Sequence, residues 1–247
     1  MEYAENYLQS LMPSANIESI DNSKYQGATY EADLGENMSD VLFQSLNQKF
    51  DLIIDFGTTD HIYNFPMALF NSSTFLNKNG VIIHALCANN WINHGFYQIS
   101  PDLFYSLYSE KNGYSNTEVF LSINKKTKHF YRVNKTIGTK RATAESASET
   151  YVLAMSTLGS NGFSHSQIYQ TDWLPRWNPD ALVIRAVKLN NIKKYKQLLA
   201  TRFPYIRSLY VKFYDYVYWH ILKMLRLEKI NRLNSNLQII KVKTLLS

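Results

Sequence analysis

The sequence predicts an α/β fold in which helices flank a mostly parallel β-sheet, with a helical extension at the C-terminus. Residues 50–56 and 81–87 are nearly continuous apolar runs, as is typical of strands buried on both faces of a parallel sheet. Residues 64–76 between them read as a helix, with Pro66 in the first turn, where its missing N–H costs little. A strand, a helix and a second strand in this order are typical of α/β sheets.

The other elements follow from start and stop signals along the chain. Residues 3–12 read as a helix that Pro13 ends, and residues 39–47 read as a helix with Ser39 as its N-cap. The remaining expected elements are strands at 16–21, 27–33, 117–124, 129–133 and 181–188, a short helix at 101–109, a surface insert at 134–150 and a loop at 172–179, while residues 151–158 fit a strand or a helix.

The composition suits one large domain, or one domain with an appendage. Of the 247 residues, 45% are hydrophobic and 14% are aromatic, which argues against wholesale disorder. Cys87 is the single cysteine, so neither an internal disulfide nor a thiolate metal cluster can form. Its place in an apolar strand favours a buried, inert thiol. The six histidines show no metal-binding spacing, and no metal site is predicted.

Positive charge is concentrated near the C-terminus. Residues 188–247 contain 13 Lys and Arg against two acids, a net charge of +11, whereas residues 1–187 contain 13 against 18, a net charge of −5. We therefore expect an α/β domain over 1–190 and a basic, aromatic helical tail over 191–247.

Within this tail, residues 203–227 place apolar side chains on one helical stripe beside Lys, Arg, Tyr and Trp. The pattern favours packing on the sheet or on another subunit, with an anionic membrane surface as the alternative. No nucleic-acid-binding motif accompanies the charge, so no nucleic-acid partner is expected.

The N-terminal residues MEYAENYLQSLM begin with acids and read as a helix rather than a secretion signal. The sequence contains no run of about 18 apolar residues, the length that a helix needs to cross a bilayer. The sequence thus predicts a cytoplasmic protein, with peripheral contact to the inner face of the membrane if the tail binds lipid. The oligomeric state stays open.

Polar side chains crowd the exits of the strands predicted at 50–56 and 81–87, directly after each strand ends. The first exit carries Asp55, Gly57, Thr58, Asp60 and His61, and the second carries Asn89, Asn90, His94, Tyr97 and Gln98. In an open α/β sheet, ligands bind beyond the carboxyl ends of the strands. The sequence therefore predicts a ligand site at this edge of the sheet.

Each of these residues has a chemical interpretation and a structural one. Burying Asp55 in an apolar run is costly unless the carboxylate has a partner, and Gly57 lets the backbone approach a ligand closely. His61 could accept a proton from a substrate hydroxyl or amine, or it could cap or pack against the next helix. In the second exit, His94 and Gln98 could hold a polar acceptor, or they could satisfy backbone groups of a structural loop.

Three stretches of the chain are similar to class I S-adenosylmethionine-dependent methyltransferases, which have a Rossmann-like fold with a seven-stranded sheet. These stretches are Ser19–Ala28 (SIDNSKYQGA) with Asp33 and Leu34, Phe50–Pro66 (FDLIIDFGTTDHIYNFP), and Asn89 and Asn90 followed by His94–Phe104 (HGFYQISPDLF). The resemblance is to a bacterial group of methyltransferase-domain proteins and covers about residues 3–125. HGFYQISP is the most specific of these patterns.

The resemblance implies S-adenosylmethionine as the cofactor and a small or glycan-like acceptor that is methylated on oxygen or nitrogen. It also implies that Asp21 accepts hydrogen bonds from the ribose hydroxyls and that Asp33 contacts the adenine amino group, although both acids are also typical turn residues. The site expected from the resemblance comprises His61 and His94 as catalytic residues, Asp21, Asp33, Leu34, Asp55, Gly57 and Thr58 around the cofactor, and Asn89, Asn90, Tyr97 and Gln98 around the acceptor.

The start of the chain departs from the pattern of this family. Such folds open with a strand and a glycine-containing loop near the methionine part of the cofactor, whereas this chain begins at what resembles the first helix and contains no G-x-G. We therefore expect a domain that is incomplete at its N-terminus. The alternative function is a catalytically inactive, methyltransferase-like binding or scaffolding module that uses the basic tail.

Overall fold

The computed structural model describes residues 4–123, 129–136, 141–166 and 168–173, together with two strands at 232–233 and 237–241. The described residues belong to two compact units, one made of residues 4–32 and the other of the described residues from 33 onward. The strand predicted at 181–188, the domain boundary predicted at residue 190 and most of the tail lie outside the described residues.

The N-terminal unit contains a helix and a two-stranded parallel sheet. Helix α1 spans Ala4–Leu11, and strand β1 (Ile20–Asp21) pairs with strand β2 (Tyr30–Glu31). Both strands lie inside the segments predicted to be strands but are only two residues long. The segments NIESID and GATYEAD contain few of the apolar side chains that stabilise a longer strand.

The larger unit is built on a six-stranded sheet with the strand order β10–β6–β5–β8–β4–β3. Its strands are β3 (Phe50–Asp55), β4 (Leu76–Cys87), β5 (Tyr114–Ile123), β6 (His129–Val133), β8 (Thr150–Leu158) and β10 (Leu237–Lys241). Strands β3 and β4 are parallel neighbours, and the other four neighbouring pairs are antiparallel. The sheet is therefore mixed.

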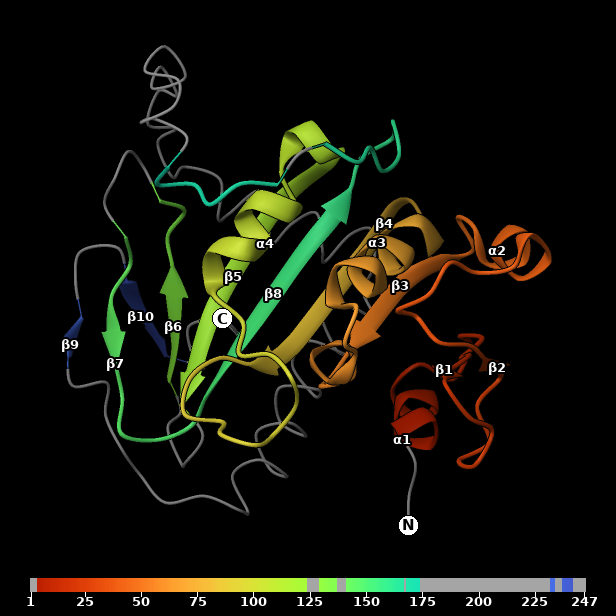
Figure 1. Cartoon of the computed structure of the whole chain (residues 1–247), viewed down its shortest axis with the longest axis horizontal. Coiled ribbons are helices and arrows are strands. Elements are labelled where there is room, and N and C mark those ends of the chain that lie inside the picture. Colours follow the sequence, from red (N-terminus) through yellow and green to blue (C-terminus); the bar gives the residue numbers. More distant parts are fainter. Residues whose placement is uncertain are drawn as a thin grey trace. The chain divides into compact units, whose positions relative to one another are not determined.

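The predicted Rossmann-like α/β class is confirmed, but neighbouring strands are not mostly parallel as expected. Strand β8 lies between β4 and β5 and runs against both, so β3, β4 and β5 share one direction (Figure 1). The chain passes from β3 to β4 through helix α3 (Phe65–Phe75), and this forms a βαβ unit of the kind found in Rossmann-like folds. Residues 151–158, which fitted a strand or a helix, are part of β8.

The helices predicted in this unit are present with slightly shorter bounds. Ser39 is the N-cap of α2 (Asp40–Leu46), although its side chain makes no capping hydrogen bond. Helix α3 begins after Asn64 and has Pro66 in its first turn. The other helices are α4 (Pro101–Leu107) and the 3₁₀ helices η1 (Thr59–His61) and η2 (Glu110–Asn112).

The core of the larger unit forms where α3 and α4 pack on the sheet. Phe65 of α3, Phe104 of α4, Ile82 of β4 and Val119 of β5 belong to one buried apolar cluster. Gly80 lies where β4 passes close to its own first residues, because a Cβ there would come within 2.8 Å of the Asn77 carbonyl oxygen.

The C-terminal residues that the structure describes are strands rather than helix. Strand β10 pairs antiparallel with β6, and β9 (Arg232–Leu233) pairs antiparallel with β7 (Ala144–Glu145). The prediction of a helical tail over 191–247 is therefore wrong for these two segments, because pairing with β6 satisfies backbone groups that an open sheet edge would leave exposed. The apolar stripe predicted at 203–227 lies outside the described residues.

Candidate functional site

The segments that follow β3 and β4 lie at one edge of the sheet, where both strands end (Figure 1). Strand β3 leads through a short turn into η1, and β4 leads into the loop 88–100 before α4. The backbone amides of Phe96 and Tyr97 donate hydrogen bonds to the Asp60 carbonyl oxygen, at 2.9 and 3.2 Å. The expectation that the two polar exits meet is confirmed.

Gly95 makes this close contact between the loop and η1 possible. Its φ of +55° lies in the left-handed region, and a Cβ at this position would come within 2.9 Å of the Asp60 carbonyl oxygen. A residue other than glycine would therefore be strained and would push the loop away from η1.

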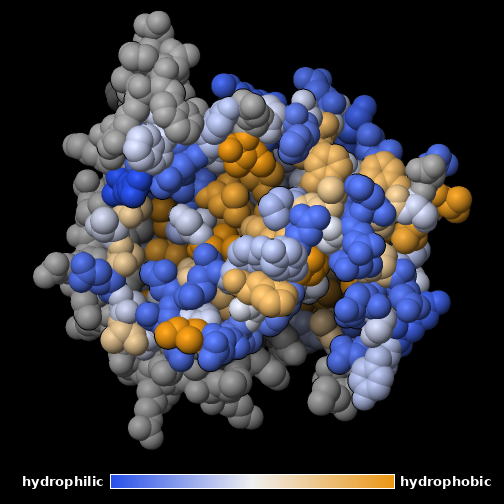
Figure 2. Space-filling model, viewed as in Figure 1, coloured by the Kyte–Doolittle hydropathy of each residue, from blue (hydrophilic) through white to orange (hydrophobic). Residues whose placement is uncertain are grey.

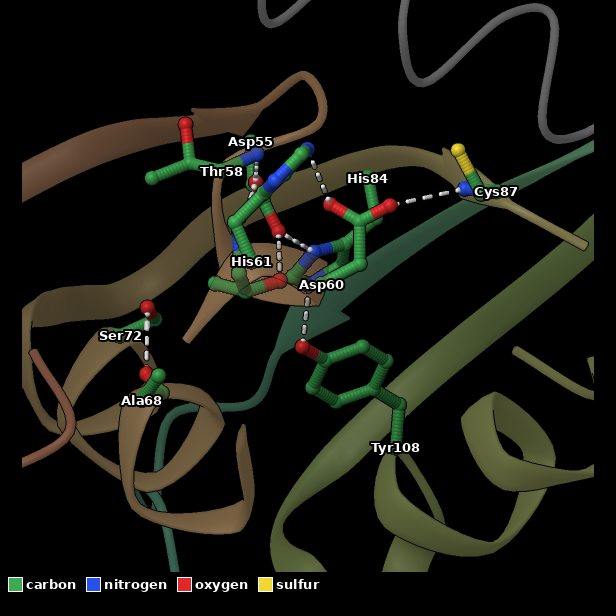
Figure 3. Close-up of polar contacts among 10 residues, drawn as sticks. Asp55, Thr58, Asp60, His61, Ala68, Ser72, His84, Cys87 and Tyr108 are labelled. Atoms are coloured by element: carbon green, nitrogen blue, oxygen red, sulfur yellow. Dashed lines mark hydrogen bonds and ion pairs between the residues drawn. The ribbon is translucent and has the colours of Figure 1, made fainter. Parts of the chain in front are cut away.

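Asp55, at the end of β3, is buried and has the partners that its burial requires. Its Oδ1 accepts hydrogen bonds from the backbone amides of Thr58 (3.1 Å) and Thr59 (3.2 Å). Its Oδ2 accepts one from the Thr59 hydroxyl (2.5 Å) and lies 2.7 Å from His84 Nδ1 (Figure 3). Both oxygens are engaged within the protein, so Asp55 holds the turn that leads into η1.

His84 lies opposite Asp55 in the register of β3 and β4 and is fully buried. Its Nε2 lies 2.5 Å from the hydroxyl oxygen of Tyr108, which follows α4 (Figure 3). Asp55, His84 and Tyr108 thus form a buried polar chain that joins two strands to the end of a helix.

The pKa shifts in this chain follow from its burial and its contacts. Burial alone would raise the pKa of Asp55, but the hydrogen bond and charge of His84, with the bonds from Thr59 and Thr58, lower it below the ordinary 3.8. Burial, followed by Tyr114 and Asp55, raises the pKa of Tyr108 well above 10.0. The Tyr108 hydroxyl therefore keeps its proton beside His84 Nε2.

Asp60, in η1, is fully buried, yet one of its carboxylate oxygens has no hydrogen bond. Oδ2 accepts a hydrogen bond from the Cys87 amide at 3.3 Å. Oδ1 has no hydrogen-bond partner among the described residues, and it lies 3.9 Å from His61 Nε2 (Figure 3). A buried acceptor without a partner is costly, so this oxygen marks a position where a further interaction would be favourable.

Cys87 is buried at the end of β4, as predicted. Burial raises the pKa of its thiol to about 12, with further contributions from a hydrogen bond to Asp60 and the charge of that carboxylate. The thiol therefore stays protonated and is unsuited to nucleophilic chemistry.

His61 and His94, the two predicted catalytic residues, lie side by side and are exposed. Their ring centroids are 5.1 Å apart with the rings at 75°. Trp91 lies next to His94, at 4.9 Å between centroids, and also contacts Tyr151 of β8 at 4.7 Å. The structure thus brings the two histidines together and adds Trp91, which the sequence pattern did not single out.

Exposed apolar side chains stand two residues along the chain from each histidine. Tyr63, Ile92 and Phe96 are 81%, 82% and 68% exposed, and the rings of Tyr63 and Phe96 are 6.2 Å apart. Figure 2 shows hydrophobic side chains standing among hydrophilic ones over the loop that follows β4. An acceptor bound beside the histidines would therefore meet both polar and apolar side chains.

Three of the four residues predicted to bind the acceptor have polar atoms engaged within the protein. Asn90 donates to the Ser146 and Ser148 carbonyl oxygens (both 2.8 Å), Gln98 accepts from the Trp91 amide (3.2 Å), and the Tyr97 hydroxyl donates to the Tyr63 carbonyl oxygen (2.6 Å). These contacts hold the shape of the loop. The side chain of the fourth residue, Asn89, is exposed.

The two predicted cofactor acids are exposed and make hydrogen bonds within turns. Asp21, in the N-terminal unit, accepts a hydrogen bond from the Ser23 amide at 2.9 Å. Asp33, in the larger unit, accepts one from the Gly35 amide at 2.7 Å. Each carboxylate therefore has a structural role, and each is also open to solvent on its other side.

The other predicted cofactor residues belong to the larger unit and are Leu34, Gly57 and Thr58. The Leu34 carbonyl oxygen accepts a hydrogen bond from Asn71 of α3 at 2.8 Å. Gly57 has a φ of +77°, and no heavy atom lies within 4 Å of the position that a Cβ would occupy. Thr58 is exposed. The first exit is therefore open to a ligand at Gly57 and Thr58.

Sequence reasoning missed His84, Tyr108 and the unpaired oxygen of Asp60. A signal for His84 was present, because VIIHALC and FDLIID each place a polar side chain in an otherwise apolar strand. Tyr108 gave no such signal, since Tyr is common in cores and its partner His84 lies 24 residues earlier.

The described residues contain no group of three or more His, Cys, Asp or Glu side chains that could hold a metal ion. None of the helices in this part of the chain is long and apolar enough to cross a membrane.

Comparisons with known proteins give one structural likeness. No protein family matches the chain, and no curated protein matches it. Among solved structures, the chain is similar to the crystal structure of a S-adenosylmethionine-dependent methyltransferase from Clostridium acetobutylicum ATCC 824, with 15% sequence identity and a TM-score of 0.29 over 62% of this chain and 80% of that one. A likeness of this size is too weak to assign an activity.

Proposed function

We propose that the chain is a S-adenosylmethionine-dependent methyltransferase that acts on an oxygen or nitrogen of a small or glycan-like acceptor in the cytoplasm. The observation that supports this most strongly is the meeting of η1 and the loop 88–100 at the ends of β3 and β4, with His61 and His94 exposed side by side. Ligands of open α/β sheets bind at this edge.

The residues of the first exit fit such a cofactor. The open space at Gly57 would let the backbone approach a ligand closely, and the exposed Thr58 offers a hydroxyl beside it. Asp33 and Leu34 would contribute from the segment tied to α3, while the role of Asp21, which belongs to the N-terminal unit, stays a prediction from the resemblance. The bound cofactor supplies a methyl group already activated as a sulfonium.

The chain's own residues would orient the acceptor and remove its proton. The acceptor oxygen or nitrogen forms a bond to the methyl carbon while the methyl–sulfur bond breaks, and the bonding electron pair stays on sulfur. His61 would take the acceptor's proton, and His94 and Trp91 would hold the acceptor against it. Orienting two bound reactants removes much of the barrier of a bimolecular step.

Calorimetric titration of the full-length chain with S-adenosylmethionine tests this proposal. We expect saturable binding, and the absence of binding at millimolar cofactor would defeat the proposal.

Gly57→Ala and Gly162→Ala form a matched pair, because their φ values are +77° and +79° and neither Cβ would clash. Gly57→Ala should weaken cofactor binding and Gly162→Ala should not, although both strain the backbone equally.

The alternative is a catalytically inactive binding or scaffolding module. The observation that favours it is the net charge of +11 over residues 188–247, beside Tyr and Trp, which suits an anionic membrane surface or a partner. Cofactor titration separates the two candidates, because the inactive module would show no binding of S-adenosylmethionine while retaining its partner.

A further inference from the structure

The unpaired oxygen of Asp60 is the buried polar atom closest to the proposed reaction site. Its carboxylate is held in place on one side, where Oδ2 accepts from the Cys87 amide and the Asp60 carbonyl oxygen receives the Phe96 and Tyr97 amides. Oδ1, on the other side, has no partner among the described residues. These bonds hold the backbone of Asp60 and one oxygen of its carboxylate in place.

Among the described residues, His61 is the ion-pair partner of this oxygen. Its Nε2 lies 3.9 Å from Asp60 Oδ1, about 1 Å beyond hydrogen-bond distance. The His61 side chain is 47% exposed whereas that of Asp60 is 0% exposed, so the imidazole has room to move and the carboxylate does not. Catalytic hydrogen bonds are commonly long before a substrate binds and shorten when it does.

We infer that Asp60 is the positioning residue for His61: its fixed carboxylate holds the imidazole with Nε2–H toward Oδ1 and leaves Nδ1 free to receive a proton from the acceptor. This inference rests on the proposed function for its catalytic meaning. When Nδ1 takes the acceptor's proton, the ring becomes an imidazolium, and the buried negative charge of Asp60 stabilises it. A carboxylate that orients a histidine and stabilises its protonated form serves many hydrolytic sites in the same way.

The other titratable groups around this pair do not compete for Oδ1. His94 faces His61 from the loop 88–100 with the edge of one ring toward the face of the other. Figure 3 shows Cys87 on the side of Asp60 away from His61, and the charge of Asp60 contributes to raising the pKa of Cys87 and of Tyr151. Among the described residues, His61 is the ion-pair partner of the free oxygen, at 3.9 Å.

The position of the ring proton on His61 tests the inference without cofactor or acceptor. In two-bond ¹H–¹⁵N spectra of the neutral histidine rings, the His61 signals, assigned by their loss in His61→Gln, should show the proton on Nε2. In Asp60→Asn, the amide oxygen still has to accept from the Cys87 amide, so the NH2 group faces His61. An NH2 group can only donate, and the ring proton should therefore shift to Nδ1.

Asp51→Asn is the matched control, because Asp51 is an exposed carboxylate of β3 that accepts from the Asn77 side chain at 3.1 Å. It should leave the His61 signals unchanged, and unchanged amide signals of the core residues Ile82 and Val119 show that Asp60→Asn has kept its fold. Equal proton positions in the parent chain and Asp60→Asn would overturn the inference. So would a parent chain with the proton on Nδ1, which is decisive even if Asp60→Asn does not fold.

Calorimetry with S-adenosylmethionine tests the proposed function separately. A chain that does not bind the cofactor but shows the expected shift of the ring proton would defeat the methyltransferase proposal and retain the pairing of Asp60 with His61. For a chain that binds, Asp60→Asn should keep cofactor affinity within about twofold of the parent chain, since the substitution changes no atom in contact with the open face at Gly57.

Discussion

Asp55 and His84 face each other across the parallel neighbours β3 and β4, and their side chains meet with 2.7 Å between Oδ2 and Nδ1. Both are buried, and His84 continues the contact to Tyr108. This chain of polar contacts ties the end of β3, strand β4 and the end of α4 into one unit. The position of the candidate site therefore depends on a polar network in the core as well as on apolar packing.

Replacing His84 with Leu should destabilise the protein strongly, because it leaves the buried carboxylate of Asp55 without its partner. Breaking a buried charged pair from one side costs about 3–5 kcal/mol. Tyr108→Phe removes only the outer bond of the network and should cost about 1–3 kcal/mol. Urea unfolding of both variants measures the difference. A cost for His84→Leu below that for Tyr108→Phe would show that Asp55 does not depend on His84.

Acid should weaken the fold through Asp55. Its pKa is lowered in the folded protein from the ordinary 3.8, so the unfolded chain takes up a proton at a higher pH than the folded one does. The stability that this carboxylate contributes is complete above the unfolded pKa and is lost as the pH falls through the folded pKa. Between about pH 5 and pH 2, we expect the free energy of unfolding to fall more steeply in the parent chain than in Asp55→Asn. Asp51→Asn, as the control, should behave like the parent.

Gly95→Ala should loosen the contact between η1 and the loop 88–100. The new Cβ would lie 2.9 Å from the Asp60 carbonyl oxygen at a φ of +55°, and strain of this kind costs about 1–3 kcal/mol. Gly162→Ala also has a positive φ but no clash, so it isolates the backbone contribution. Thermal unfolding compares the two, and hydrogen exchange of the Phe96 and Tyr97 amides should accelerate only in Gly95→Ala. Slow exchange of these amides in that variant would contradict the role given to Gly95.

His61→Ala should lower methyl transfer without lowering cofactor affinity. Loss of a general base costs about 100- to 10,000-fold in rate, whereas His61 is not among the residues expected at the cofactor. Transfer of a radiolabelled methyl group from S-adenosylmethionine to a set of candidate small and glycan acceptors measures turnover, and calorimetry measures binding. His165→Ala, which removes a histidine packed on Phe70 and Phe163, is the control. Undiminished turnover in His61→Ala would remove it from the base role.

The basic tail is best tested by substitution rather than deletion. Deleting residues 203–247 would remove β10, which pairs with β6, so a loss of binding would be confounded by a loss of sheet structure. Changing Arg207, Lys212, Lys223 and Arg226 to Gln keeps the chain length. If the tail meets an anionic membrane, this variant should lose about 4 kcal/mol of binding to vesicles containing phosphatidylserine in a sedimentation assay. Neutral phosphatidylcholine vesicles give the background binding. Equal binding of the parent chain and the variant to the anionic vesicles would exclude electrostatic membrane contact through these residues.

Local patterns in the sequence predicted most of the elements and one edge of the sheet. The strand at 129–133 has the predicted bounds, β3 differs from the prediction by one residue at its end, and α3 differs by one residue at each end. Periodicity, N-caps and proline positions act within a few residues, so they can be read without a tertiary structure. The polar residues after β3 and β4 followed directly from these element ends.

Contacts between distant residues decided what local patterns could not. The direction of β8 between β4 and β5, the pairing of β10 with β6 about a hundred residues earlier, and the link from His84 to Tyr108 all join residues far apart in the chain. The residues of a strand do not indicate which strand pairs with it or in which direction it runs. Both depend on which apolar faces become buried together. For the same reason Asp60 looked like any polar turn residue in the sequence, and only the folded chain shows a buried carboxylate with one oxygen facing His61.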